Sequence, residues 1–371
     1  MATTSGLRGP TSNVITKEQV AGTERRWRRF GEPVPAGASV REDGSPDYGL
    51  FGPDSIVWKV MLHPATIVFQ YPAQSAIQSS YRPILAGVRD HDPISRAARK
   101  GELNHFGMFE RTQRNSGMHA PMWLGDTETA ERMAKHLRNI HQKVAGEVID
   151  VGDPELGGYA AAGPREAMWA ALTEMHSMLW AYEGLAFRDG RPPHRLPPHE
   201  RDQFMAEAAA YCRLVGADEE EIPTSIAELD ALYVKYGHLF GPTATMAVIP
   251  ETGENINLLY FENLRKNYHK SQRAVARYNG PINHTLFRMW VGAVGSEQLR
   301  AWMGMTPEQS RRAVRRTKLS MPLIWLFQRG PVERHFMRLM WGPDGVTLIR
   351  SAREQVKKAK AAARAQARAA R

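Results

Sequence analysis

Apolar residues in the middle of the chain recur every three or four positions, which is the spacing of one helix face. Asp126 precedes the clearest example and is a suitable N-cap, because its carboxylate can accept hydrogen bonds from the first free N–H groups of a helix. The pattern predicts one amphipathic helix over residues 126–148. Its predicted buried stripe consists of Ala130, Met133, Leu137, Ile140, Val144 and Val148.

The same spacing and similar end signals predict helices along most of the remaining chain, whereas alternating strand patterns are sparse. No internal repeat is present. The sequence therefore predicts an all-α protein with a single large helical domain. The other predicted helices are 164–187, 198–214, one that starts at Ser225 with Glu228 as its capping-box partner, 283–294, 296–304 and 306–319.

Changes in composition divide the chain into three parts. Residues 1–48 are polar and rich in Gly, Pro and Arg, which predicts an N-terminal arm that wraps the domain or is partly disordered. Residues 49–345 form the predicted helical domain, and residues 346–371 form a basic, Ala-rich tail. The tail is expected to be a solvated helix. The alternative is that its basic side chains hold it at the surface of a membrane that contains anionic lipid.

Charge and cysteine content exclude several classes of protein. The net charge is +10, but residues 350–371 carry eight basic residues and one acidic residue. The rest of the chain therefore has little excess positive charge, which argues against binding of nucleic acid. No apolar run approaches the roughly 20 residues of a membrane span, and the first residues do not resemble a secretory signal. Cys212 is the only cysteine, which excludes an internal disulfide or an iron–sulfur cluster held by this chain. These features predict a cytoplasmic protein.

His141 is the strongest candidate for a cofactor ligand. It lies four positions after Leu137 and three before Val144, so it is expected at the edge of the apolar stripe. A neutral imidazole that faces an apolar slot suits the axial position of a haem iron, and Gly146 would leave room for a planar group. His176, beside the apolar stripe of the helix at 164–187, is a second pocket candidate. The alternative for both histidines is a core side chain with a hydrogen-bond partner.

Several segments, in conserved order along the chain, resemble the MpaB and rubber-oxygenase (latex-clearing protein) family. They are residues 52–60 (GPDSIVWKV), 141–146 (HQKVAG), Tyr159-Ala160 with Pro164, Trp169 and Thr173, and 222–224 (IPT) with Glu228 and Leu229. The resemblance implies an all-helical fold and, as in the rubber-cleaving members, a non-covalent haem b with a histidine axial ligand, here His141. It also implies an oxygenase that uses dioxygen on a hydrophobic, isoprenoid- or lipid-like substrate.

The pair Arg111-Thr112 precedes His141 by 29 residues, counted from the threonine, which is similar to a basic-Thr pair of the family. The resemblance implies that this pair lies near the distal face of the haem, where a cation and a hydroxyl can stabilise negative charge that develops on dioxygen. The alternatives are a surface ion pair for Arg111 and a helix cap for Thr112. Met108 and Ala171 stand where many relatives have Arg and His.

Two other functions remain open from the residues alone. A non-haem metal enzyme would use His91 and Asp92, with His63 and Asp150 as possible neighbours, although Pro93 disfavours a helical conformation at Asp92. A cofactor-free helical domain that binds a lipid or a protein partner is the other alternative, and the departures at Met108 and Ala171 favour it.

Overall fold

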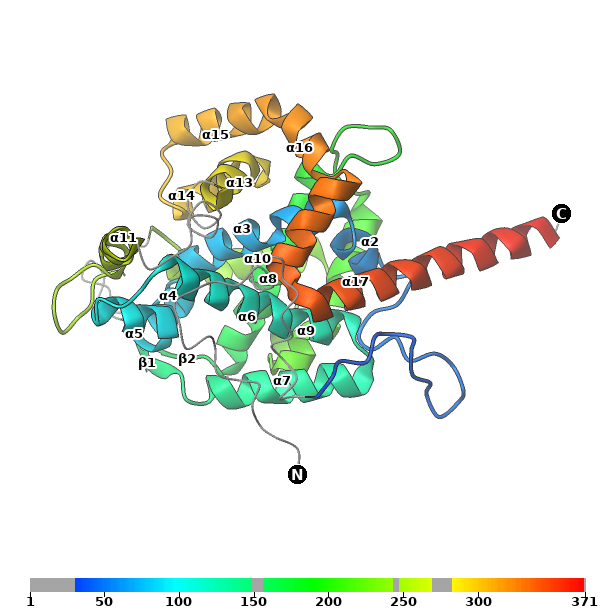
Figure 1. Ribbon diagram of the computed structural model, residues 1–371, viewed down its shortest axis with the longest axis horizontal. Helices are drawn as coiled ribbons and strands as arrows, with labels where there is room; N and C mark the ends of the chain where they lie inside the picture. The colour runs from blue at the N-terminus through cyan, green and yellow to red at the C-terminus, as the bar shows by residue number, and fades with distance from the viewer. Residues whose placement is uncertain (1–30, 149–155, 243–246, 269–281, 370–371) are drawn as a thin grey trace.

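The computed structural model describes residues 31–148, 156–242, 247–268 and 282–369, and Figure 1 shows their helical arrangement. The described chain is all-α apart from one two-stranded sheet, as the sequence predicts. Its α-helices are α2 (Ile56–Met61), α3 (Pro64–Ser80), α4 (Arg82–His91), α5 (Pro93–Arg99), α6 (His105–Leu124), α7 (Thr127–His141), α8 (Pro164–Leu185), α9 (Pro198–Val215), α10 (Ile226–Lys235), α11 (Ile256–Lys266), α13 (Asn283–Trp290), α14 (Glu297–Trp302), α15 (Pro307–Leu319), α16 (Met321–Phe327) and α17 (Gly330–Ala369). Short 3-10 helices lie at Glu219–Glu221 (η2), Gly237–Leu239 (η3) and Val291–Ala293 (η6).

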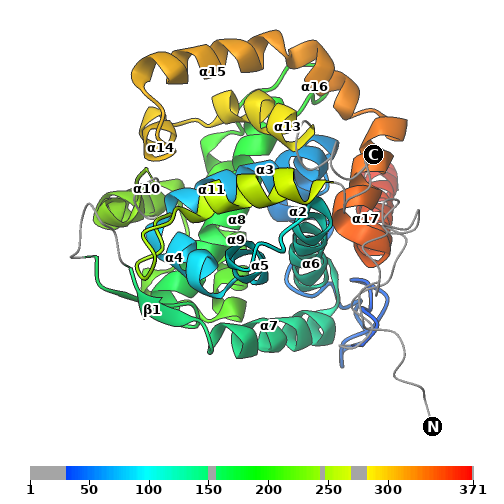
Figure 2. The same ribbon diagram turned by 60° about the vertical axis from the view of Figure 1, so that its left-hand side comes forward.

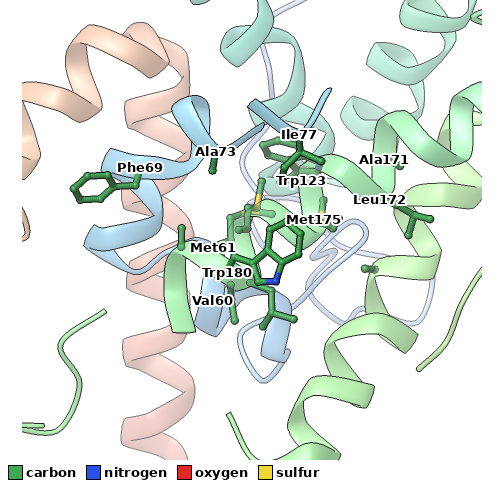
Figure 3. Close-up of a cluster of buried hydrophobic side chains, with 14 of the residues drawn as sticks. Val60, Met61, Phe69, Ala73, Ile77, Trp123, Ala171, Leu172, Met175 and Trp180 are labelled. Atoms are coloured by element: carbon green, nitrogen blue, oxygen red, sulfur yellow. The ribbon is translucent and has the colours of Figure 1, made fainter. Parts of the chain in front are cut away.

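Helix α8 lies at the centre of the molecule, and nearly all of its side chains are buried. It packs against α3 and α9, while α6 packs against α7 and the first half of α17. Figure 3 shows how Met61, Ile77, Trp123 and Met175 from four different helices meet in the interior. Burial of this apolar surface is the main term that favours the fold, at about 25 cal/mol per Å².

The helix ends follow the capping residues of the sequence. The Asp126 carboxylate accepts a hydrogen bond from the Thr129 N–H at 2.9 Å at the start of α7. The Ser225 hydroxyl accepts one from the Glu228 N–H at 3.2 Å at the start of α10. At α15, Thr306 forms a complete capping box with Gln309. The predicted helix starts at these three positions are therefore confirmed.

The predicted helix over 126–148 is too long, because α7 ends at His141. Residues Ala145–Glu147 form strand β1, which pairs in antiparallel register with β2 (Gly158–Ala160), so that Gly146 lies opposite Tyr159. Gly146 disfavours helix continuation, and hydrogen bonds to the β2 segment replace the helical ones. The Val144 carbonyl accepts from the Ala161 N–H, and the Val148 N–H donates to the Gly157 carbonyl, both at 2.8 Å.

The N-terminal end of the described chain packs against the helical domain, whereas the C-terminal end projects from it. Residues 35–47 of the predicted arm contact the α6–α7 corner, where Asp47 accepts a hydrogen bond from the Thr127 hydroxyl at 2.7 Å. Residues 1–30 of the predicted arm lie outside the described residues. Helix α17 bends at Gly342 (φ 68°), and its side chains are exposed from about Lys360 onward, where it projects from the body (Figure 1). Among the described helices, none combines the length and apolar character needed to cross a bilayer.

Candidate functional site

A cavity with a largely apolar wall lies among α4, α6, α7, α8 and the β1–β2 hairpin. Its enclosed volume is about 280 Å³, and the empty space grows to about 1170 Å³ when the mouth open to solvent is included. Leu137, Ile140 and Val144 of the predicted buried stripe line it, but Leu137 and Val144 are only half-buried and Ile140 is 41% exposed. We call it the His141 cavity.

His141 is the last residue of α7 and lines this cavity. Burial lowers the pKa of its imidazole, as does the positive charge of Arg111, while a hydrogen bond to the backbone of Ala161 acts in the opposite sense. A bond that favours the imidazolium has the ring N–H as donor, so the acceptor is the Ala161 carbonyl. His141 is thus neutral at pH 7, with one ring nitrogen oriented by a carbonyl. Metal-ligating histidines commonly have this second partner.

Arg111 also lines the His141 cavity, but its charge is already partnered. Its Nε donates to the Asp92 carboxylate at 2.7 Å, and Asp92 is the extended N-cap of α5. Burial disfavours the charged guanidinium, yet Asp92 and neighbouring groups raise the Arg111 pKa on balance. The ion pair therefore fixes a positive charge at the cavity wall. The sequence offered a surface ion pair as the alternative for Arg111, and the structure has an ion pair whose Asp92 partner is buried.

Thr112 does not face the His141 cavity. Its hydroxyl lies 3.0 Å from the Tyr71 hydroxyl and lines a second cavity, of about 410 Å³, together with Met108 and Trp302. Consecutive residues on an α-helix point about 100° apart, so a pair in sequence does not form a pair in one pocket. The expectation that Arg111 and Thr112 share a distal face is not met in this arrangement.

Gly146 and His176 also lie apart from the cavity lining. Gly146 faces Tyr159, and a Cβ at this glycine would lie 2.9 Å from the Tyr159 hydroxyl oxygen. His176 lines a third cavity, where its Nδ1 is 3.1 Å from the Tyr233 hydroxyl and its ring contacts Trp180. Burial and the charge of Arg201 lower the His176 pKa to about 3. The core-histidine alternative describes this arrangement better than a pocket that contains both His141 and His176.

Two residues that the sequence did not single out, His119 and Glu174, lie together on the cavity wall. The His119 Nε2 is 3.0 Å from the Glu174 carboxyl, and its Nδ1 is 2.8 Å from the Asn115 carbonyl. Gln74 and Tyr211 each donate to Glu174 at 2.7 Å. Burial raises the pKa of Glu174 to about 8 and lowers that of His119 to about 4. At pH 7 the pair holds one proton, on Glu174, which donates to His119 Nε2.

The catalytic-domain model of the family described as ER-bound oxygenase mpaB/B′ and rubber oxygenase matches residues 58–341. The chain belongs to this family. Comparison with the curated proteins and with solved structures gave no significant match. The MpaB and rubber-oxygenase resemblance and the all-α fold are thus confirmed, and the family is one of oxygenases, which are oxidoreductases.

Within this MpaB/rubber-oxygenase domain, the two departures from the family pattern fall in different places. Ala171 lines the His141 cavity, beside Ala167 and Ala170 on α8, where small side chains leave space. Met108 lines the second cavity, away from His141. The change at Met108 therefore leaves the wall around His141 unaltered.

The residues of the non-haem alternative do not gather as a ligand set. His91 Nε2 lies 3.0 Å from the Ala145 carbonyl, Asp92 is paired with Arg111, and the His63 ring caps α3. Asp150 lies outside the described residues. Among the residues that the structure describes, no group of three or more His, Cys, Asp or Glu side chains is placed to hold a metal ion. A haem iron, in contrast, requires only one protein ligand, and the donor set around His141 fits that requirement.

Proposed function

We propose that the chain is a haem b-dependent oxygenase that uses dioxygen on a hydrophobic, isoprenoid- or lipid-like substrate. The observation that carries the proposal is the neutral His141 imidazole, oriented by the Ala161 carbonyl, on the wall of an apolar cavity. When bound, the haem supplies an iron able to activate dioxygen.

The surrounding side chains have separate tasks in this proposal. Leu137, Ile140 and Val144 offer an apolar surface to the substrate. Arg111, held by Asp92, supplies a fixed positive charge that stabilises negative charge developing on oxygen. Glu174 holds a proton at pH 7 beside the cavity and is placed to give or receive it.

Visible spectroscopy of the purified chain tests the ligand assignment. We expect hemin to bind with a Soret band that survives desalting, and His141→Gly to lose it. Added imidazole should restore the band in His141→Gly, because the free ring can occupy the vacated space. His176→Ala, in another cavity, and His119→Ala are the matched controls and should retain the band. Full hemin occupancy in His141→Gly without imidazole would reject His141 as the ligand.

Oxygen uptake tests the substrate class separately. The hemin-loaded chain is expected to consume dioxygen when squalene, an isoprenoid with internal double bonds, is added. Uptake with an unsaturated fatty acid but not with squalene would favour the lipid-like class. Absence of uptake with either, despite an intact Soret band, would contradict the proposed reaction while leaving the haem site standing.

A further inference from the structure

Exposed apolar side chains cluster at one place on the molecule. Four of the eleven large apolar side chains that are exposed in the described structure lie between positions 319 and 326. We call them the apolar tip, and they are Leu319 (73% exposed), Leu323 (42%), Trp325 (42%) and Leu326 (47%). Scattered apolar residues on a surface are ordinary, but a contiguous group marks an interaction site.

The apolar tip is held rigidly from behind. Ile324 on the same helix is fully buried, and the Phe327 ring packs edge-on against Phe69 and Phe336 at centroid distances of 6.2 and 5.3 Å. One face of α16 is therefore anchored in the core while the other remains exposed. The exposure is a property of the folded chain and does not arise from a loose segment.

Basic side chains adjoin the apolar tip. Helix α15 carries one acidic residue, Glu308, which is paired with Arg312 at 2.6 Å. Arg311, Arg315 and Lys318 are exposed and spaced by three or four positions, so they share one face that leads to Leu319. The five basic residues of α15 are Arg311, Arg312, Arg315, Arg316 and Lys318.

The position of these helices leaves the patch accessible. Helices α15 and α16 form an outer layer along the top of the molecule in both Figure 1 and Figure 2. Beyond α16, the Arg329 guanidinium lies 3.9 Å from the centroid of the Trp325 ring. An indole with an adjacent cation is the arrangement that proteins place at a membrane–water boundary.

We propose that α15 and α16 dock on an anionic lipid surface, with the apolar tip inserted at the headgroup boundary and the α15 basic residues on the headgroups. Nucleic acid would require the positive charge but not the exposed leucines, and an apolar protein partner would not require five basic residues. An anionic bilayer uses both features. The tail of α17, which the sequence suggested as the peripheral contact, carries exposed charge but no large apolar side chain beyond Val356. The proposal is independent of the haem assignment.

Vesicle flotation with the full chain tests this docking surface. We expect binding to vesicles of phosphatidylcholine mixed with phosphatidylserine, weak binding to phosphatidylcholine alone, and weaker binding as salt is raised. Arg311→Gln with Arg315→Gln should lower the partition coefficient by about twenty-five-fold, at about fivefold per basic residue. Trp325→Ser with Leu326→Ser should lower it on the order of tenfold or more.

Two controls separate the apolar tip from other exposed groups. Phe261→Ser removes an apolar side chain that is 71% exposed on α11, and Lys357→Gln with Lys358→Gln removes charge from the α17 tail. Both should bind vesicles like the wild type, and thermal unfolding should show that every variant is folded. The proposal is overturned if the wild type ignores phosphatidylserine, if the tail variant alone loses binding, or if the Trp325 variant changes only the oligomeric state.

Discussion

Replacing Glu174 by glutamine should abolish a loss of stability that the wild-type chain undergoes between pH 6.5 and about 8. Glutamine matches the protonated carboxyl in shape. Its oxygen can accept from Tyr211, and its amide can donate to His119, as the protonated Glu174 does. The substitution removes the ionisation, and it also removes the acceptor of the Gln74 amide, since Gln74 donates to the carboxyl oxygen that faces His119. The cost of that lost hydrogen bond is the same at pH 6.5 and pH 8, so it does not change the pH dependence.

The magnitude follows from the two shifted pKa values. Burial raises the pKa of Glu174 from 4.5 to about 8, and burial lowers that of His119 from 6.5 to about 4. Between about pH 4.5 and 6.5 the pair holds one proton in the folded state and one in the unfolded state, so the free energy of unfolding does not change with pH because of this pair. From pH 6.5 to about 8 only the folded Glu174 holds a proton, so stability falls as pH rises. About 1.5 pH units at about 1.4 kcal/mol each give a loss of about 2 kcal/mol.

Urea denaturation of both proteins at pH 6.5 and pH 8 measures this difference. The free energy of unfolding of Glu174→Gln, relative to the wild type, should rise by about 2 kcal/mol across the window. Other histidines titrate equally in both proteins and drop out of the comparison. Parallel pH profiles for the two proteins would show that Glu174 is already ionised in the folded state, which refutes the proposed proton on it.

Three further substitutions follow: the first tests the packing of the fold, and the other two test the volume and charge of the site. Gly184→Ala should lower the free energy of unfolding by about 1–3 kcal/mol in urea denaturation, because its Cβ would lie 2.5 Å from that of Ala293; an unchanged midpoint would contradict this close approach. Ala170→Phe fills the His141 cavity and should weaken hemin binding on the order of tenfold in a spectroscopic titration, about 1.4 kcal/mol, whereas unchanged affinity would place the ligand elsewhere. Asp92→Asn retains an N-cap for α5 but loses the charge that holds Arg111, which should cost about 1.5–3 kcal/mol of unfolding free energy; equal stability in the variant would argue against the ion pair.

The helical fold could be predicted from the sequence because its signals are local. Asp126, Ser225 and Thr306 each cap a helix that the spacing of the following apolar residues predicts. Helices α8 and α9 end within two residues of the predicted ends. The end of α7 was mispredicted because Val144 and Val148 continue a spacing that suits a helix. Their partners, Ala161 and Gly157, lie 17 and 9 residues further along the chain and pair with them through the antiparallel hairpin. Such pairing depends on tertiary contacts and leaves little trace in local periodicity.

The candidate site was predictable only in part, for a related reason. His141 reaches the cavity through its place on one helix, which periodicity describes. The pairing of His119 with Glu174 joins α6 to α8, and that of Arg111 with Asp92 joins α6 to the start of α5. One signal was available for Glu174, since it interrupts a helix whose apolar residues occupy nearly every side. A carboxyl at such a position must be buried and therefore needs partners.

The end of α7 at His141 explains why His141, Val144 and Gly146 occur at this spacing. Because α7 stops at His141, the chain turns, Val144 lines the cavity, and its carbonyl binds the Ala161 N–H. The same turn brings the Ala161 carbonyl to the His141 ring. Gly146 then permits close contact with Tyr159, whose hydroxyl donates to Asp90 at 3.0 Å and fixes the hairpin on α4. The three residues thus specify a turn that orients one imidazole, and a continuous helix through 148 would lose the carbonyl that orients it.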